Sequence, residues 1–89
     1  MKTIWKYSIN PRQNKIQMPS GAQILSIQTQ RGEPQLWALV DPNNKKETRI
    51  LQVYGTGWDM PEFPGKYLGS FQVEKETLIF HVFDLTDQG

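Results

Sequence analysis

The chain has 89 residues, ten Lys or Arg against nine Asp or Glu, and a formal net charge of +1. This length suits one domain, predicted over residues 1–89, and excludes a deep cleft between two lobes. The near balance of charge excludes indiscriminate binding to duplex nucleic acid. The sequence has no cysteine, which excludes a disulfide framework, a thiolate zinc site and a cysteine nucleophile.

Hydrophobic residues make up 37% of the chain and aromatic residues 11%, a composition typical of a folded domain. No apolar run approaches the roughly 18 residues of a membrane span, and Met1 to Lys6 lacks the apolar core of a signal peptide. We therefore expect a cytoplasmic protein without membrane contact, with a frayed end at residues 87–89.

In the first half of the chain, apolar residues alternate with polar ones, which predicts strands. Trp5, Tyr7 and Ile9 fall on one face of the first strand, and a short stretch from Lys15 to Met18 precedes the turn residues Pro19-Ser20-Gly21. Gln23 to Gln30 and Gln35 to Val40 are expected to form a hairpin. The second of these is apolar on both faces, as a central or barrel strand would be.

The second half resumes the extended pattern from Thr48 to Tyr54. Residues 55–65 hold three glycines and two prolines, which predicts a loop. Lys66 to Glu74 and Thr77 to Phe83 are expected to close the chain as a hairpin with its turn at Lys75-Glu76. Strict alternation would place four residues of its first strand on one face: Tyr67, Gly69, Phe71 and Val73.

Six or seven short strands about ten residues apart predict an all-β fold, a small antiparallel barrel or a sandwich with little or no helix. Strand order, register and barrel closure are left open by the sequence. Because a sheet of this size cannot easily hide its edges, we expect a homo-oligomer.

Few residues suit catalysis or metal binding. His81 is the one histidine and lies in an apolar strand, so it is interpreted as a structural residue bonded to a carbonyl. Asp59 and Glu62 in the loop are interpreted as solvated acids, and the remaining carboxylates have no metal-binding spacing. We therefore expect no enzyme activity, no metal and no cofactor.

The segment Gly55-Thr56-Gly57 is the strongest local candidate for a binding site. Backbone N–H groups beside glycines can converge on an anion, with the Thr56 hydroxyl as a further donor. Trp58 and Phe63 offer flat faces for a base or a sugar, and Arg49 and Lys66 flank the loop. Two other interpretations stay open: a plain tight turn, and Trp58 folded back as a lid on the core.

Charge is uneven along the chain. Residues 1–32 hold five basic side chains and no acid, whereas residues 33–89 hold five basic and nine acidic side chains. If the five early cations, Lys2, Lys6, Arg12, Lys15 and Arg31, share a face, they form a positive patch, and otherwise they form an ordinary solvated surface.

Several blocks of the sequence resemble a family of small bacteriophage and prophage proteins without an assigned function. The blocks are MKTIWKY from Met1, LWALVDP from Leu36, VYGTG from Val53 and FHVF from Phe80, and together they span nearly the whole chain. The resemblance implies a phage setting and a compact β fold, with no catalytic residue to carry over. Trp58 stands where the resemblance leads us to expect a histidine.

By analogy, a small phage protein without enzyme motifs suggests a binding role against host defence. The leading hypothesis is sequestration of a cyclic or other signalling nucleotide by Arg49, Lys66 and the loop residues, completed by Arg12 or Arg31 of a neighbouring subunit. One alternative is an inhibitor that binds a host defence or regulatory protein through Trp58 and Phe63. Another is a virion or assembly accessory protein.

Overall fold

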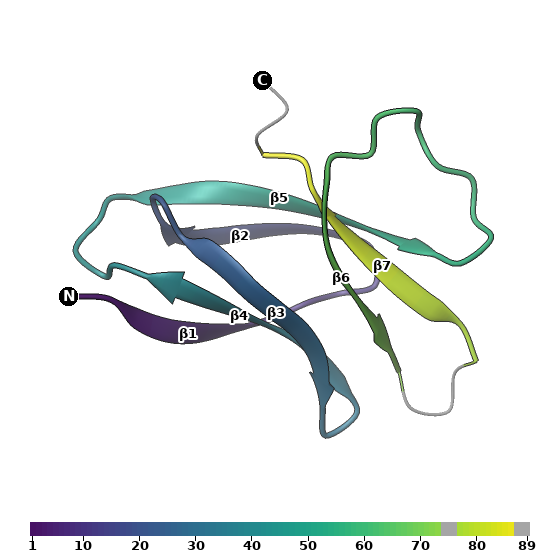
Figure 1. Cartoon of the computed structure of the whole chain (residues 1–89), viewed down its shortest axis with the longest axis horizontal. Coiled ribbons are helices and arrows are strands. Elements are labelled where there is room, and N and C mark those ends of the chain that lie inside the picture. Colours follow the sequence, from purple (N-terminus) through teal and green to yellow (C-terminus); the bar gives the residue numbers. More distant parts are fainter. Residues whose placement is uncertain (74–76, 87–89) are drawn as a thin grey trace.

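The computed structural model describes residues 1–73 and 77–86, so the turn expected at Lys75-Glu76 and the end expected to fray lie outside the described residues. Within these ranges the chain forms seven strands in two antiparallel sheets and no helix (Figure 1). The described part accordingly holds no helix long and apolar enough to cross a membrane. The all-β prediction is confirmed, and of the two architectures left open the chain adopts the sandwich.

The first sheet has three strands in the order β1 (Thr3–Ser8), β4 (Glu33–Val40) and β3 (Gln23–Gln30). Strands β3 and β4 form the expected hairpin, and its turn holds Arg31 at φ 53° and Gly32 at φ 79°. Strand β4 is the central strand that its two apolar faces predicted, because β1 pairs along its other edge.

The second sheet has four strands in the order β2 (Gln13–Pro19), β5 (Lys46–Gly55), β7 (Ile79–Asp84) and β6 (Lys66–Gln72). Strands β6 and β7 form the expected hairpin. The prediction that Tyr67 shares a face with Gly69 and Phe71 is wrong. The register shifts between Tyr67 and Gly69, so the extra residue, Leu68, turns Tyr67 to the outer face while Gly69 and Phe71 face the core.

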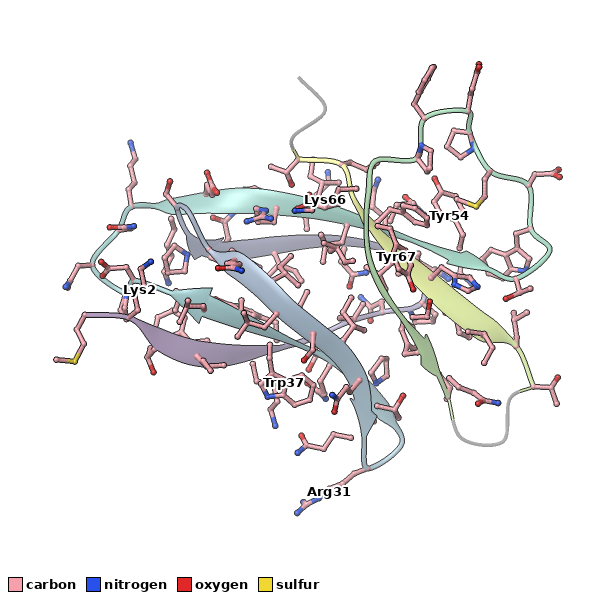
Figure 2. The ribbon with its side chains drawn as sticks, viewed as in Figure 1. Lys2, Arg31, Trp37, Tyr54, Lys66 and Tyr67 are labelled. Atoms are coloured by element: carbon pink, nitrogen blue, oxygen red, sulfur yellow. The ribbon has the colours of Figure 1, made fainter. Side chains whose placement is uncertain are left out.

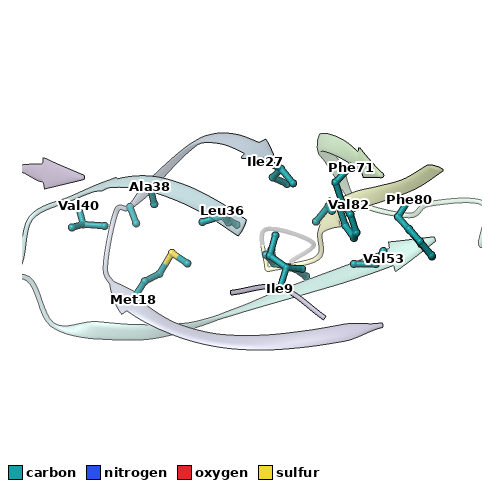
Figure 3. Close-up of a cluster of buried hydrophobic side chains, with 12 residues drawn as sticks. Ile9, Met18, Ile27, Leu36, Ala38, Val40, Val53, Phe71, Phe80 and Val82 are labelled. Atoms are coloured by element: carbon teal, nitrogen blue, oxygen red, sulfur yellow. The ribbon is translucent and has the colours of Figure 1, made fainter. Parts of the chain in front are cut away.

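The core lies between the inner faces of the two sheets (Figure 3). Leu36, Ala38 and Val40 of β4 face Met18, Leu51, Val53 and Val82 of the second sheet, and all seven side chains are buried. Strand β3 runs beside β6 on one side of the sandwich, where the Thr29 hydroxyl donates a hydrogen bond to the carbonyl of Gln72 at 2.7 Å. This contact joins the two sheets without closing them into one barrel.

The long loop expected over residues 55–65 is present between β5 and β6 and projects beyond the sheets (Figure 1). Gly57 at φ 87° and Gly65 at φ 103° occupy backbone conformations that L side chains rarely adopt. The glycines therefore set where this loop turns away from β5 and where it returns to β6.

Candidate functional site: the end of the sandwich beside Trp58

The turn after β5 is held by backbone hydrogen bonds. The Trp58 amide donates to the Gly55 carbonyl at 3.0 Å, and the Thr56 amide donates to the carbonyl of Ile79 at 3.0 Å. The Thr56 hydroxyl also donates to the Ile79 carbonyl, at 3.0 Å. The amide and the hydroxyl of Thr56 thus both donate to a carbonyl of the protein. They are therefore not free to bind an anion, as the sequence had suggested.

Trp58 folds back over the end of the sandwich. Its indole lies so close to Gly55 that a Cβ at Gly55 would stand 2.6 Å from Trp58 Cε2. The indole also meets Phe80 edge to face, with ring centroids 5.9 Å apart and an interplanar angle of 83°. Half of Trp58 remains exposed, so it is a lid on the core that still offers one surface to a ligand.

A pocket of about 480 Å³ opens beside this lid. We call it the end pocket; its lining residues are Pro11, Arg12, Gln52, Val53, Trp58 and Phe80. Arg12 reaches it from the link between β1 and β2, where its carbonyl accepts a hydrogen bond from the Val53 amide at 3.1 Å. The sequence hypothesis had assigned Arg12 to a neighbouring subunit, whereas the fold brings it to Trp58 within one chain.

Arg49 and Lys66 lie elsewhere. They line a separate pocket of about 380 Å³ between the beginnings of β3 and β6, together with Glu47 and Asp84. Arg49 and Gly55 are six residues apart on β5, which is about 20 Å of extended chain. The structure therefore divides the predicted set: Gly55, Thr56, Gly57 and Trp58 stay together, while Arg49 and Lys66 do not join them.

Phe63, the last member of the predicted set, is in the middle of the long loop and is 75% exposed. Trp58 and Met60 in the same loop are also exposed. No lining residue of the end pocket comes from this part of the loop beyond Trp58. Phe63 is therefore a free aromatic side chain on the loop surface and not a wall of the end pocket.

Arg49 has a structural partner that the sequence analysis did not assign. Its guanidinium Nη2 lies 2.5 Å from Asp84 Oδ2, and Nη1 donates to the Ala22 carbonyl at 2.9 Å. The side chains of Arg49 and Asp84 are only 10% and 1% exposed. A buried ion pair of this kind links β5 to β7 and to the start of β3.

Burial alone raises the pKa of Asp84, but hydrogen bonds from Arg49 and Thr86 and the Arg49 charge lower it more, so the pKa lies below its ordinary value. A carboxyl group with a depressed folded pKa adds stability above its unfolded pKa of about 4 and loses it as the pH falls through the folded pKa. We expect melting temperature to fall more steeply below about pH 4 in the wild type than in Asp84→Asn, measured by circular dichroism. Equal slopes would contradict this role for Asp84.

His81 belongs to a chain of side-chain hydrogen bonds on the outer face of the second sheet. Because the Thr56 hydroxyl donates to Ile79, it must accept from His81 Nε2, 2.8 Å away. His81 Nδ1 shares a hydrogen bond of 2.7 Å with the Ser70 hydroxyl, which in turn shares one of 2.7 Å with the Tyr67 hydroxyl. The prediction that His81 bonds to a carbonyl is therefore wrong: its partners are two hydroxyl groups.

The five cations of residues 1–32 do not share one face. The pairing of β1 with β4 puts Lys6 beside Trp37 on the outer face of the first sheet, whereas Lys15 pairs with Ile50 on the outer face of the second. Figure 2 shows Lys2 near the N-terminus and Arg31 at the tip of the β3–β4 hairpin, at separate ends of the molecule. The uneven charge of the sequence is thus dispersed over the fold.

Within the described residues, no three acidic or histidine side chains group in a way that would hold a metal ion.

Comparison with known families gave a match over residues 1–89 to a family described as a domain of unknown function (DUF7352). The chain belongs to this family. No curated protein and no solved structure matches it. Membership in DUF7352 assigns neither an activity nor a phage origin, so any function must be argued from the geometry of this chain.

Sequence reasoning missed Arg12 and Phe80 as neighbours of Trp58, and it missed Ser70 as a partner of His81. Arg12 lies in a link without regular structure, and its position depends on how the chain crosses between the sheets. The Ser70 and His81 contact depends on the register of β6 against β7, which pairs these two residues directly. The local sequence around His81 could not supply this cross-strand partner.

Proposed function

We propose that this protein is a non-enzymatic binding protein that takes up a nucleotide in the end pocket. The observation that carries the proposal is the meeting of a cationic side chain, Arg12, with two aromatic ones, Trp58 and Phe80, around one pocket. An aromatic face suits a base, and a guanidinium suits a phosphate. The pocket volume of about 480 Å³ lies within the range of small-molecule sites.

Binding without turnover is the mode of action that these residues support best. Trp58 and Phe80 are already fixed edge to face, so little ordering is needed when a ligand enters. Tight stoichiometric binding lowers the free concentration of a signal without any chemical step. In the phage setting that the sequence blocks suggest, the protein acts in the bacterial cytoplasm against host defence, as a homo-oligomer, by sequestering a signalling nucleotide.

The proposal is tested by a thermal-shift screen against cyclic dinucleotides, cyclic trinucleotides and linear mononucleotides. A ligand at about 100 times its Kd adds roughly 2.7 kcal/mol of stability and raises Tm measurably. For a hit, we expect Trp58→Ala and Arg12→Ala each to weaken binding by about tenfold or more in isothermal titration. The matched controls are Phe63→Ala, an exposed aromatic of the same loop, and Arg31→Ala at the hairpin tip, neither of which should change Kd.

Gly55→Ala supplies a variant that keeps every pocket side chain. A Cβ at Gly55 would overlap the indole of Trp58, so the lid must move and binding should weaken as in Trp58→Ala. The shift of Trp58 is read as the change in tryptophan emission that disappears when Trp58→Phe is added, because Trp5 and Trp37 also emit. The nucleotide assignment would be wrong if no nucleotide in the screen raised Tm. It would also be wrong if the Kd of a hit changed in Phe63→Ala or Arg31→Ala but not in Trp58→Ala and Arg12→Ala.

A second candidate function, inhibition of a host protein, is favoured by one observation. The loop exposes Trp58, Met60 and Phe63, which are 50%, 43% and 75% exposed. Exposed large apolar side chains on one loop are typical anchors in protein interfaces. In this case Phe63→Ala, which leaves nucleotide binding intact, should abolish capture of the protein partner in a pull-down.

A further inference from the structure

The outer face of the second sheet carries aromatic side chains on three adjacent strands. The register places Tyr67 of β6 opposite Phe83 of β7, and Tyr54 of β5 opposite His81 of β7. Directly paired residues point to the same side of a sheet, and this side is the one opposite the buried Val53 and Val82. We call the four side chains Tyr54, Tyr67, His81 and Phe83 the aromatic platform.

The aromatic platform is held in place by its own contacts. Phe83 meets Tyr54 at a centroid distance of 5.9 Å and Tyr67 at 5.5 Å, in edge and tilted arrangements. The hydrogen bonds from Tyr67 through Ser70 to His81 hold the fourth ring, His81, and give Tyr67 a second contact. Figure 2 labels Tyr54 on β5 and Tyr67 on β6, in the region where these strands flank β7. The rings are therefore ordered before any ligand arrives, which lowers the entropic cost of binding.

The platform remains open to a ligand. Tyr67 is 55% exposed, and Tyr54, His81 and Phe83 are each half-buried. An aromatic cluster on the outer face of a sheet contributes little to the core, which here lies on the opposite side of the same strands. Its exposed faces are the surface that a planar ligand would use.

The charge and polarity of this face suit an anionic ligand. The register shows which residues of β2, β5, β6 and β7 face outward, and these include Lys15 and Lys46. None of them is acidic, because the two acidic residues of these strands, Glu47 and Asp84, point inward. The same face carries the side-chain amides of Gln13, Gln17 and Gln52. Amides can bond to the edges of nucleic-acid bases, and lysines can contact phosphates.

We propose that the aromatic platform binds a short single strand of nucleic acid, with bases stacked on Tyr67 and Tyr54 and the backbone passing toward Lys15. A four-stranded antiparallel sheet with aromatic side chains on adjacent strands can stack about two or three bases. A duplex is excluded from this mode because its bases are already stacked on one another. This site is distinct from the end pocket and does not depend on the function proposed there.

The test is fluorescence anisotropy with a fluorescein-labelled oligouridine of about ten nucleotides at low salt. We expect saturable binding by the wild type and a loss of roughly 5- to 150-fold in affinity for Tyr67→Ala, which corresponds to about 1–3 kcal/mol per stacked base. Tyr67→Phe keeps the ring and loses the bond to Ser70, so it should retain most of the affinity. Because the outer face of these strands carries two lysines, Lys15 and Lys46, the slope of log affinity against log salt should be no steeper than about −1.4.

Two further variants make the result specific. Trp5→Ala removes an aromatic side chain from the first sheet and should leave oligouridine binding unchanged. Arg12→Ala should weaken nucleotide binding in the end pocket without affecting oligouridine, so failure of either proposal is recognised separately. The inference is overturned if oligouridine shows no saturable binding, if a duplex of the same length binds equally well, or if a Tyr67→Ala variant with an unchanged melting curve keeps wild-type affinity.

Discussion

Replacing Asp84 by Ala is expected to lower the free energy of unfolding by about 3–5 kcal/mol, because the substitution leaves the buried Arg49 guanidinium without its counter-charge. Only 10% of the Arg49 side chain is exposed, so water cannot replace the lost carboxylate. The same carboxylate also accepts a hydrogen bond from the Thr86 amide at 2.8 Å, which holds the chain just after β7. Urea unfolding followed by circular dichroism measures the change.

A domain of this size has a total stability of only about 5–13 kcal/mol, so Asp84→Ala alone is expected to be close to unfolding. A double variant, Arg49→Met with Asp84→Leu, removes both charges and fills the space with apolar groups. We expect it to recover most of the lost stability, since a buried pair can be exchanged for hydrophobic residues at little cost. Asp59→Ala in the exposed loop is the control and should change stability by less than about 0.5 kcal/mol. A double variant no more stable than Asp84→Ala would show that shape, and not charge, makes Asp84 necessary.

The sequence did contain a signal for this ion pair. Arg49 falls on the same alternating face as Leu51 and Val53, and Asp84 continues the face of Phe80 and Val82. A charged residue on an apolar strand face must find a partner, so two such residues of opposite sign predict each other. The sequence analysis interpreted Arg49 as a ligand-binding residue beside the loop and did not use its position among the inward-facing residues of β5. The structure places Arg49 inside the sandwich.

Strand positions followed from the sequence because alternation and glycine or proline punctuation are local properties. What could not be derived depends on contacts between distant segments. Leu68 has nothing in its local pattern that marks a bulge, yet the bulge decides that Tyr67 joins the outer face and can reach Ser70. The end pocket likewise needs Arg12 and Trp58, which are 46 residues apart and meet only because the chain crosses from one sheet to the other.

Gly65→Ala is expected to destabilise the protein by more than about 3 kcal/mol, whereas Gly57→Ala should cost only about 1 kcal/mol. Both glycines have positive φ, 103° and 87°, so both substitutions strain the backbone. They differ in the space available: a Cβ at Gly65 would stand 2.5 Å from the Asp84 carbonyl oxygen, whereas a Cβ at Gly57 would meet nothing within 4 Å. The measurement is urea unfolding of both variants side by side.

The difference in stability between Gly65→Ala and Gly57→Ala measures how much the close packing of Gly65 against Asp84 contributes to attaching the long loop to the sheet. Gly65 precedes β6, whose first residue, Lys66, pairs with Asp84, so the close approach of Gly65 to Asp84 is what permits β6 to begin there. Adding a methyl group must push β6 away from β7 at the place where the Arg49 and Asp84 pair is buried. If both substitutions lowered the free energy of unfolding equally, backbone strain alone would explain the effect at both glycines. The position where the loop rejoins the sheet would then depend on the pairing of β6 with β7 and not on the close contact between Gly65 and Asp84.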